Sequence, residues 1–331
     1  MIQPFLSILI PTYNRVRDLK YNLMELIKII KENNISDLVD IIISDNNSND
    51  NTNKMLQEFL YLNSDVKINV KTQEVNIGAI NNMFDLLSLS NSTYVMYIGD
   101  DDYISKEYLL KVISILKNDS NTGCIVPSYQ NISPDKIPVG IGRDIGSNPQ
   151  VFNGGFRGAY QMSWRGHQMS GLVFNRQFIN QQVEKYSVNN YYLFIFFVLV
   201  SSYKYNSYLE PEYPILVTRP GQKNKTWNYN DDGLVSDIFN NYKIYNEIPY
   251  LNRCLLQLKI LDTQYWRYCM YLKKGITYFL KSLWLIFIGE NTLFLTKFLF
   301  PIYIPIILLK KLLQLLFTGK LIQVFKTKVD L

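Results

Sequence analysis

The sequence contains little cysteine and almost no histidine. The three cysteines, Cys124, Cys254 and Cys269, form no Cys-x-x-Cys pair, and His167 is the single histidine. Structural zinc sites and disulfide frameworks both need several such side chains at short spacings, so both are excluded, and we expect a reducing, cytoplasmic location. The N-terminus also lacks a basic segment followed by a long apolar core, so we expect no secretory signal.

The body of the chain has little net charge. The overall charge of +6 is concentrated from Lys273 onward, where nine lysines, Lys273 included, are opposed by Glu290 and Asp330 alone. A nearly neutral body argues against a nucleic-acid groove, and we expect no nucleic-acid partner.

The C-terminal tail lacks an apolar run of membrane-spanning length. Its longest uncharged stretch has twelve residues, 298–309, and contains Pro301 and Pro305, whereas roughly 18–20 residues are needed to cross a bilayer. Apolar helices punctuated by lysines are typical of segments that lie in the headgroup zone of an anionic membrane. The alternative is a subunit interface, which would make the protein a homo-oligomer.

Short β-type runs alternate with amphipathic helical patterns over the first 130 residues. The runs that read as strands are residues 5–10, 39–44, 66–72, 94–98 and 124–127. This alternation predicts a layered α/β domain with a mainly parallel central sheet. Ligands of such sheets bind beyond the carboxyl ends of the strands, so the polar clusters that follow the strands are the candidate site. Residues 128–170 are rich in Gly and Pro, which predicts a substrate loop.

Three adjacent carboxylates, Asp100, Asp101 and Asp102, directly follow the strand 94–98. They repel one another, and a cation at the end of the strand would relieve that repulsion. Oxygen ligands suit Mg²⁺ or Mn²⁺, held by one or two carboxylates together with a diphosphate. The alternative is a solvated acidic turn in which Asp102 caps the next helix.

Three other strands end in polar motifs. These are Pro11-Thr12-Tyr13-Asn14-Arg15, then Ser44-Asp45-Asn46-Asn47-Ser48, then Asn76-Ile77-Gly78 followed by Asn81-Asn82. With the aspartate cluster they make four motifs in order over about residues 5–105, and in this the chain resembles the family 2 glycosyltransferases. The resemblance implies a GT-A-type, Rossmann-like fold, a nucleotide-diphosphate sugar as donor, and Mn²⁺ or Mg²⁺ as cofactor.

The resemblance also implies roles for single residues. Pro11 and Tyr13 would wall the base pocket, Asp45 would accept a hydrogen bond from base or ribose, and Asn76 and Gly78 would let the backbone approach the nucleotide. Asp100 and Asp102 would hold the metal on the diphosphate. The implied donor-binding set is Pro11, Thr12, Tyr13, Asn14, Arg15, Asp45, Asn47, Asn76, Gly78, Asn81, Asp100 and Asp101. Taken singly, these residues also fit a strand stop, turns and a helix entry.

The catalytic base departs from the family pattern. Inverting members commonly use a carboxylate in a Glu-Asp pair at the start of a later helix, and here the corresponding stretch, residues 186–193, has none. His167 is the first candidate base because the pKa of histidine is near neutral, and Glu184 is the second. A late loop offers candidates to close over the diphosphate or bind the acceptor, unless it is a solvated basic loop: Arg219, Lys223, Lys225 and Trp227.

The sequence predicts that the chain has three parts. Residues 1–227 form the GT-A catalytic domain, with a nucleotide-sugar half (1–127) and an acceptor half (128–227). Residues 228–274 form a helical connector, and 275–331 form basic, hydrophobic helices that associate peripherally with a membrane.

The predicted function is metal-assisted sugar transfer to a polyprenyl-diphosphate-linked oligosaccharide at the cytoplasmic face of a bacterial inner membrane, as in O-antigen or capsule assembly. The absent carboxylate base leaves a membrane-bound, non-catalytic scaffold that binds sugar or nucleotide as the alternative. A dinucleotide oxidoreductase or a sugar-phosphate nucleotidyltransferase would need a glycine-rich loop after the first strand, where this chain has Pro-Thr-Tyr-Asn-Arg.

Overall fold

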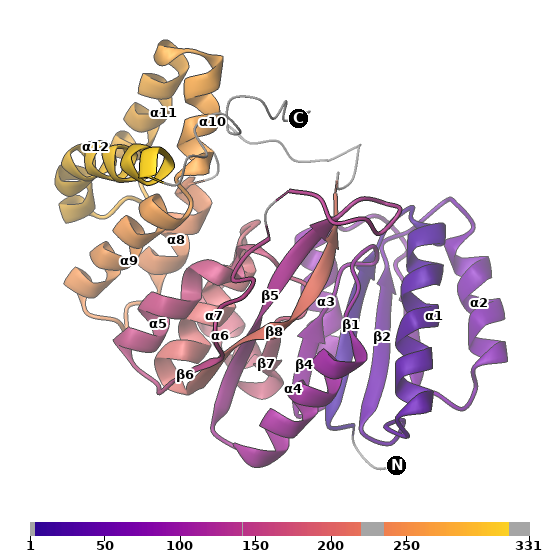
Figure 1. The fold of residues 1–331 in the computed structure, drawn as a ribbon. Helices are drawn as coiled ribbons and strands as arrows, with labels where there is room; N and C mark the ends of the chain where they lie inside the picture. The colour runs from indigo at the N-terminus through magenta and orange to yellow at the C-terminus, as the bar shows by residue number, and fades with distance from the viewer. Residues whose placement is uncertain (1–3, 141, 220–234, 318–331) are drawn as a thin grey trace. The chain divides into compact units, whose positions relative to one another are not determined.

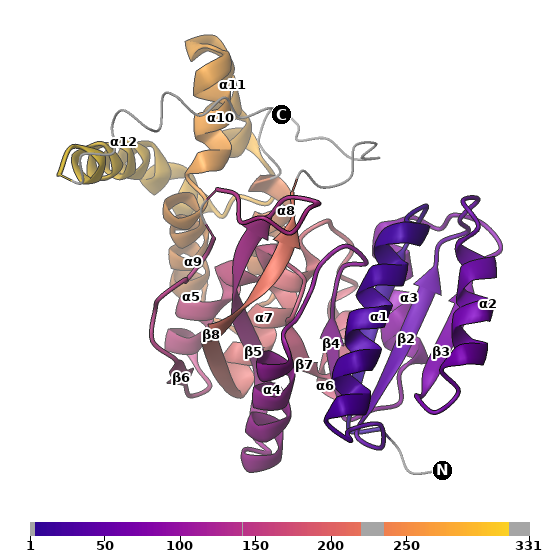
Figure 2. The same ribbon diagram turned by 45° about the vertical axis from the view of Figure 1, so that its right-hand side comes forward.

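The structure is a computed structural model that describes residues 4–140, 142–219 and 235–317. It divides into two compact units, residues 1–226 and 227–331. The first unit contains a single eight-stranded sheet with the strand order β3-β2-β1-β4-β7-β5-β8-β6, which Figures 1 and 2 show from two sides. In the described residues of the second unit, all the secondary-structure elements are helices, joined by short connections.

The N-terminal half of the sheet is parallel. Its strands are β1 (Leu6–Thr12), β2 (Val39–Asp45), β3 (Ile68–Thr72) and β4 (Tyr94–Tyr97). β1 lies between β2 and β4 and pairs with both in parallel, and β3 extends the sheet beyond β2. This arrangement confirms the mainly parallel, layered α/β fold predicted from the alternating pattern.

The C-terminal half of the sheet mixes strand directions. β7 (Val173–Asn175) runs antiparallel between β4 and β5 (Thr122–Ile132), and β8 (Asn206–Thr218) is parallel to β5. The edge strand β6 (Gln150–Phe152) pairs antiparallel with β8. Residues 128–170 therefore hold more regular structure than their glycines indicate, because α5 (Phe156–Met162) and a 3₁₀ helix (Ser163–His167) follow β6.

Helices cover both faces of the sheet. One face carries α1 (Val16–Glu32), α2 (Thr52–Leu62) and α4 (Lys106–Asn118), whose apolar residues form one core cluster with β1 and β2. The opposite face carries α3 (Ala79–Leu89), α6 (Arg176–Tyr186) and α7 (Leu193–Lys204). There the ring of Tyr97 packs edge-on against Phe194 of α7, with centroids 4.8 Å apart. With both faces covered, the carboxyl ends of the parallel strands remain as the open edge for ligands.

The second unit consists of five helices within residues 235–317. They are α8 (Val235–Ile244), α9 (Tyr250–Thr263), α10 (Trp266–Lys274), α11 (Ile276–Ile288) and α12 (Phe294–Phe317). Among the described residues, no helix combines the length and the apolar character needed to cross a bilayer. α11 and α12 nevertheless expose many large apolar side chains, including Trp284, Phe298 and Ile302.

Candidate functional site

A cavity of about 300 Å³ lies at the carboxyl ends of β1, β2 and β4. β1 and β2 end in register, with Thr12 beside Asp45, and β4 flanks the other side of β1. The loops that follow the three strands therefore meet at one edge. The residues that line the cavity are Pro11, Thr12, Tyr13, Arg15, Asn46, Asn76, Gly78, Ala79, Asn82, Met83, Gly99, Asp100, Asp101, Asp102 and Met169.

Nine of the residues predicted for donor or metal binding line this cavity. They are Pro11, Thr12, Tyr13, Arg15, Asn76, Gly78, Asp100, Asp101 and Asp102. The other four, Asn14, Asp45, Asn47 and Asn81, are not among the lining residues. Asn14 and Asn47 have left-handed backbones, with φ of 53° and 65°, a conformation that asparagine tolerates better than most residues. These two residues shape the turns that frame the cavity.

Arg15 bridges two of the three aspartates. Its Nη1 lies 2.8 Å from Oδ1 of Asp100 and 2.7 Å from Oδ2 of Asp101. The second oxygen of Asp100 accepts a hydrogen bond of 2.8 Å from the Thr12 hydroxyl. The Arg15 guanidinium thus forms ion pairs with two carboxylates that line the cavity.

Asp102 is held by a separate set of donors. Its Oδ1 accepts a hydrogen bond of 3.0 Å from the backbone N–H of Thr218, at the end of β8, and its Oδ2 accepts one from the hydroxyl of Ser170. Gln168 Nε2 lies 3.4 Å from the same Oδ2. Two segments of the C-terminal half of the sheet therefore reach this carboxylate, since Ser170 lies shortly before β7 and Thr218 ends β8.

Asn22 donates hydrogen bonds to the backbone of the turn formed by residues 99–102, which carries the three aspartates and is called the aspartate turn below. This side chain is buried on α1, and its Nδ2 donates to the carbonyl oxygen of Gly99 at 3.3 Å and to that of Asp102. The backbone N–H of Gly99 donates to the Ser170 hydroxyl at 2.9 Å. These hydrogen bonds hold both ends of the aspartate turn, Gly99 and Asp102, and so restrict the orientation of its carboxylates.

The environment raises the pKa of all three carboxyl groups. Burial, opposed by Arg15, raises the pKa of Asp100 to about 7. Burial, together with the charge of Asp101, raises the pKa of Asp102 to about 6. The pKa of Asp101 also rises, again chiefly through burial. A cation at this edge would favour the ionised carboxylates, which burial and mutual repulsion disfavour.

Asp45, the last residue of β2, is fully buried. Oδ1 of Asp45 accepts from the backbone N–H of Ser48 at 3.2 Å and from its hydroxyl, whereas Oδ2 is buried without a hydrogen-bond partner in the described structure. Burial raises the pKa of this carboxyl group. Asn46 lines the cavity in its place, and it donates to Oδ1 of Asn76 at 3.0 Å and accepts from the backbone N–H of Ile77 at 2.9 Å.

The two candidate bases lie in different surroundings. Nδ1 of His167 is 3.0 Å from the carbonyl oxygen of Trp164, Nε2 is 3.4 Å from the Tyr129 hydroxyl, and the imidazole stacks on the Trp164 ring. His167 lies two residues before Met169, which lines the cavity. Glu184 is exposed on α6 and does not line the cavity.

The late basic loop is described only at its start. The exposed Arg219 places Nε 3.3 Å from Oδ1 of Asn131, and its charge opposes the rise in the pKa of Asp102. Lys223, Lys225 and Trp227 lie outside the described residues.

Several residues of the site had weak or no signals in the sequence. Asn46 and Asn82 belong to polar runs that follow strands, but the resemblance to family 2 glycosyltransferases implies no role for them. Asn82 is buried, and its amide exchanges hydrogen bonds with the carbonyl and hydroxyl groups of Ser44. Met169 and Ser170 had no signal, because about seventy residues separate them from the aspartates they approach.

Comparison with protein families identifies the domain that holds this cavity. Residues 7–169 match the model of the family described as glycosyl transferase family 2. A curated relative, the GalNAc(5)-diNAcBac-PP-undecaprenol beta-1,3-glucosyltransferase of Campylobacter jejuni, is 25% identical over 202 residues. That alignment covers 57% of this chain and 62% of the relative, so the chain matches less than two thirds of that protein's length.

Solved structures share the fold. Residues 1–349 of TarS from S. aureus, in complex with UDP-GlcNAc, give a TM-score of 0.61 at 14% identity, covering 84% of this chain and 79% of that chain. The mannosyltransferase PcManGT from Pyrobaculum calidifontis, in complex with GDP-Man and Mn²⁺, gives 0.56 at 11% identity, covering 85% and 74%. At these identities the likeness confirms the GT-A-type fold, and the fold alone.

Proposed function

We propose that this chain, whose residues 7–169 form a family 2 glycosyltransferase domain, transfers a sugar from a nucleotide-diphosphate sugar to a lipid-linked oligosaccharide. The observation that carries the proposal is the cavity at the carboxyl ends of β1, β2 and β4, with three aspartates in its lining. Its position agrees with the rule that open α/β sheets bind nucleotides beyond their strand ends.

The nucleotide would occupy the part of the cavity formed by the loops after β1, β2 and β3. Tyr13 offers an aromatic face for the base, and Asn46 and Asn76 are already hydrogen-bonded to each other along the wall. Gly78 has a φ of 82° and nothing within 4 Å of an added Cβ, so the backbone there is open to a ligand. Asp45 is the proposed partner of base or ribose, since its buried Oδ2 has no partner among the described residues.

The aspartates fit a hard divalent cation of the Mn²⁺ or Mg²⁺ type. Within residues 4–140, 142–219 and 235–317, no three His, Cys, Asp or Glu side chains converge on a common point as a complete metal site. Such cations on nucleotides need one or two carboxylates, because the diphosphate and water supply the other ligands. Asp100 and Asp102 would hold the ion, which when bound neutralises charge on the departing nucleoside diphosphate.

The chain's own side chains would divide the remaining work. Arg15, now shared by Asp100 and Asp101, lies in the cavity where it can pair with a diphosphate. His167 is the proposed base that removes the proton of the acceptor hydroxyl, and its Nδ1 contact with the Trp164 carbonyl orients the ring. Ser170 and the Thr218 N–H hold Asp102 in place while the sugar transfers.

The proposed acceptor and location are supported by features outside the cavity. The Campylobacter jejuni relative is named for an acceptor on undecaprenol diphosphate. The second unit exposes apolar side chains and carries lysines, a combination that suits an anionic membrane surface. We therefore place the enzyme peripherally on the cytoplasmic face of a bacterial inner membrane, in assembly of a surface glycan such as O-antigen or capsule.

Donor titration tests this proposal. Calorimetry with UDP- and GDP-sugars, with and without Mn²⁺, should detect a donor whose affinity depends on the metal, and the same mixture should release nucleoside diphosphate slowly by hydrolysis. Asp102→Asn should lose the metal dependence. A non-catalytic scaffold could bind sugar or nucleotide but would release no nucleoside diphosphate, and that result would overturn the proposal.

A further inference from the structure

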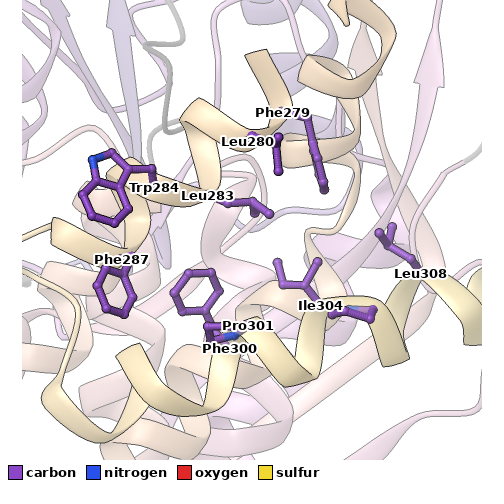
Figure 3. Close-up of a pocket in the computed structure, with 10 residues that line it drawn as sticks. Phe279, Leu280, Leu283, Trp284, Phe287, Phe300, Pro301, Ile304 and Leu308 are labelled. Atoms are coloured by element: carbon purple, nitrogen blue, oxygen red, sulfur yellow. The ribbon is translucent and has the colours of Figure 1, made fainter. Parts of the chain in front are cut away.

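A second cavity, in the helical unit, contains no polar lining residue. It has a volume of about 460 Å³ and runs between α11 and α12. Figure 3 shows side chains of the two helices facing one another across it, with Trp284 and Phe287 toward one end and Leu308 toward the other. Leu283, Phe300 and Ile304 lie between those ends. We call this cavity the α11–α12 groove.

The groove has the size and lining of a ligand site for hydrocarbon. Its volume falls within the range of small-molecule pockets. Phe279, Phe300 and Ile304 are buried and form its base, whereas Trp284 and Leu280 on its rim are 58% and 56% exposed. Other large apolar side chains of α11 and α12 are exposed as well, Phe298 and Ile302 among them, and a wide exposed apolar patch is typical of a surface that binds a membrane, a ligand or a partner.

The charges around the groove limit what can cover it. Residues 266–317 include Arg267 and six lysines, 273, 274, 281, 297, 310 and 311, against Glu290 as the single acidic residue. A second copy of this chain docked here would bring two positively charged surfaces together. An anionic amphiphile, with an apolar chain and a phosphate head, complements both the groove and its charge.

One end of the groove has ammonium groups next to it. Nζ of Lys297 lies 3.5 Å from the carbonyl oxygen of Ile288, which follows Phe287 of the groove lining. Nζ of Lys243 donates to the carbonyl oxygen of Glu290 at 2.8 Å, on the same connection between α11 and α12. A head group at the Phe287 end would therefore meet two lysines, together with the exposed carboxylate of Glu290.

We propose that the α11–α12 groove binds the isoprenoid chain of the lipid-linked acceptor, with its diphosphate at the Lys297 end. The choice of an isoprenoid over an acyl chain rests on the proposed function. The chain would lie against Leu283 and Ile304, and the cationic connection between the helices would hold the head group. The groove thus contributes to acceptor selection, separately from the donor cavity.

Photocrosslinking tests occupancy directly. The probe is a geranylgeranyl diphosphate that carries a diazirine in its chain, added to the full chain in detergent micelles. We expect labelled peptides from residues 276–288 and 294–308, competed by unlabelled geranylgeranyl diphosphate but not by a straight-chain alkyl phosphate of equal carbon number. Equal competition by the alkyl phosphate would mean that the groove accepts any membrane lipid, and would overturn the proposal.

A matched pair of variants tests the groove by function. Leu283→Trp fills it, whereas Ile302→Trp makes a similar change on the exposed side of α12 outside the lining. The KM for a polyprenyl-diphosphate acceptor should rise about tenfold in Leu283→Trp, as expected when about two methylene groups lose their burial, and should hold its value in Ile302→Trp. Equal KM changes in the two variants would contradict the assignment.

Charge variants test where the head group lies. Lys297→Gln should weaken probe binding about fivefold, and Glu290→Gln should strengthen it, because each changes one charge at the same end. Lys310→Gln, at a lysine paired with Asp262 3.5 Å away, serves as the control. Identical effects of Lys297→Gln and Lys310→Gln would show that the lysines act only through the general surface charge, and would overturn the placement.

Two further measurements separate this inference from its premises. Sedimentation of the wild type and Leu283→Trp reports whether a second copy covers the groove; a dimer that Leu283→Trp dissociates would overturn the proposal. Donor titration of the wild type reports on the glycosyltransferase function independently. Probe binding without donor binding would refute the proposed function and leave an isoprenoid site, whereas donor binding without crosslinking would refute the groove alone.

Discussion

Replacing Asp102 by asparagine should stabilise the free protein at mildly alkaline pH while abolishing its response to metal and donor. The carboxyl group is 5% exposed, and burial with the nearby charge of Asp101 raises its pKa from 3.8 to about 6. A group whose folded pKa is raised holds its proton more tightly when folded. Stability therefore falls as the pH rises from about 4 to about 6, and the whole penalty is present above that range.

The size of the effect follows from the same pKa rise. A rise of about two in the pKa corresponds to about 3 kcal/mol. This is the largest increase in the free energy of unfolding that removal of the Asp102 charge could give. Asparagine can still accept from the Thr218 N–H through its carbonyl and donate to the Ser170 hydroxyl through its amide. These hydrogen bonds are weaker with a neutral amide than with a carboxylate. We therefore expect the free energy of unfolding of Asp102→Asn to exceed that of the wild type by about 1–2 kcal/mol at about pH 8, and to equal it near pH 4.

Thermal melts across this pH range, with and without Mn²⁺ and a nucleoside diphosphate, measure both effects. The wild type should gain about 3 kcal/mol when the ligand is at about a hundredfold its dissociation constant, and Asp102→Asn should gain far less. Asp65→Asn, at an exposed aspartate paired with Lys31, removes the same charge elsewhere and should show neither change. The reasoning fails if Asp102→Asn is less stable than the wild type at alkaline pH, or if Mn²⁺ stabilises both proteins equally.

Three other substitutions probe the parts of the site separately. Asn22→Leu should lower stability by about 1–3 kcal/mol, because two backbone carbonyls of the aspartate turn lose their donor, and should weaken Mn²⁺-dependent donor binding in calorimetry; wild-type binding would contradict a positioning role. Asp45→Ala should weaken nucleoside-diphosphate binding about tenfold, and an unchanged affinity would count against its contact with base or ribose. His167→Gln should lower kcat about a hundredfold or more at saturating donor and acceptor, and full turnover would exclude it as the base.

The sequence contained most of what was needed to predict the parallel half of the sheet. β1, β2 and β4 are largely apolar runs that end in polar motifs, so both their existence and their carboxyl ends could be located. Because parallel strands present those ends at one edge, the cavity position followed as well. The predicted strand 124–127 is much longer in the structure, β5 (Thr122–Ile132). The sequence did not indicate this length because the continuation past Pro127, Ser128-Tyr129-Gln130-Asn131, is mostly polar and gives no apolar run.

The C-terminal half of the sheet was harder to predict because its contacts are distant in sequence. β7 is three residues long, and its antiparallel place between β4 and β5 depends on pairing across about fifty to eighty residues. Asn22 reads as one polar residue on an amphipathic helix, and only the fold shows that it faces the aspartate turn. Ser170 and Thr218 support Asp102 from loops and strand ends that no local pattern connects to it.

The prediction of helices at the C-terminal end rested on composition. α11 and α12 match the apolar runs of that region, but their lysines and prolines specify no partner. The membrane association, the three-part division of the chain and the residue roles in the site remain predictions.

Transfer of label from donor to lipid tests the central claim most directly. The full chain would be incubated with Mn²⁺, a radiolabelled nucleotide-diphosphate sugar chosen by titration, and a polyprenyl-diphosphate-linked oligosaccharide, and the organic phase would then be counted. The account predicts that label enters the lipid fraction with the wild type, depends on Mn²⁺, and is lost in Asp102→Asn. If the donor binds but no label moves to any lipid-linked acceptor, the protein is a binding scaffold and the account is wrong.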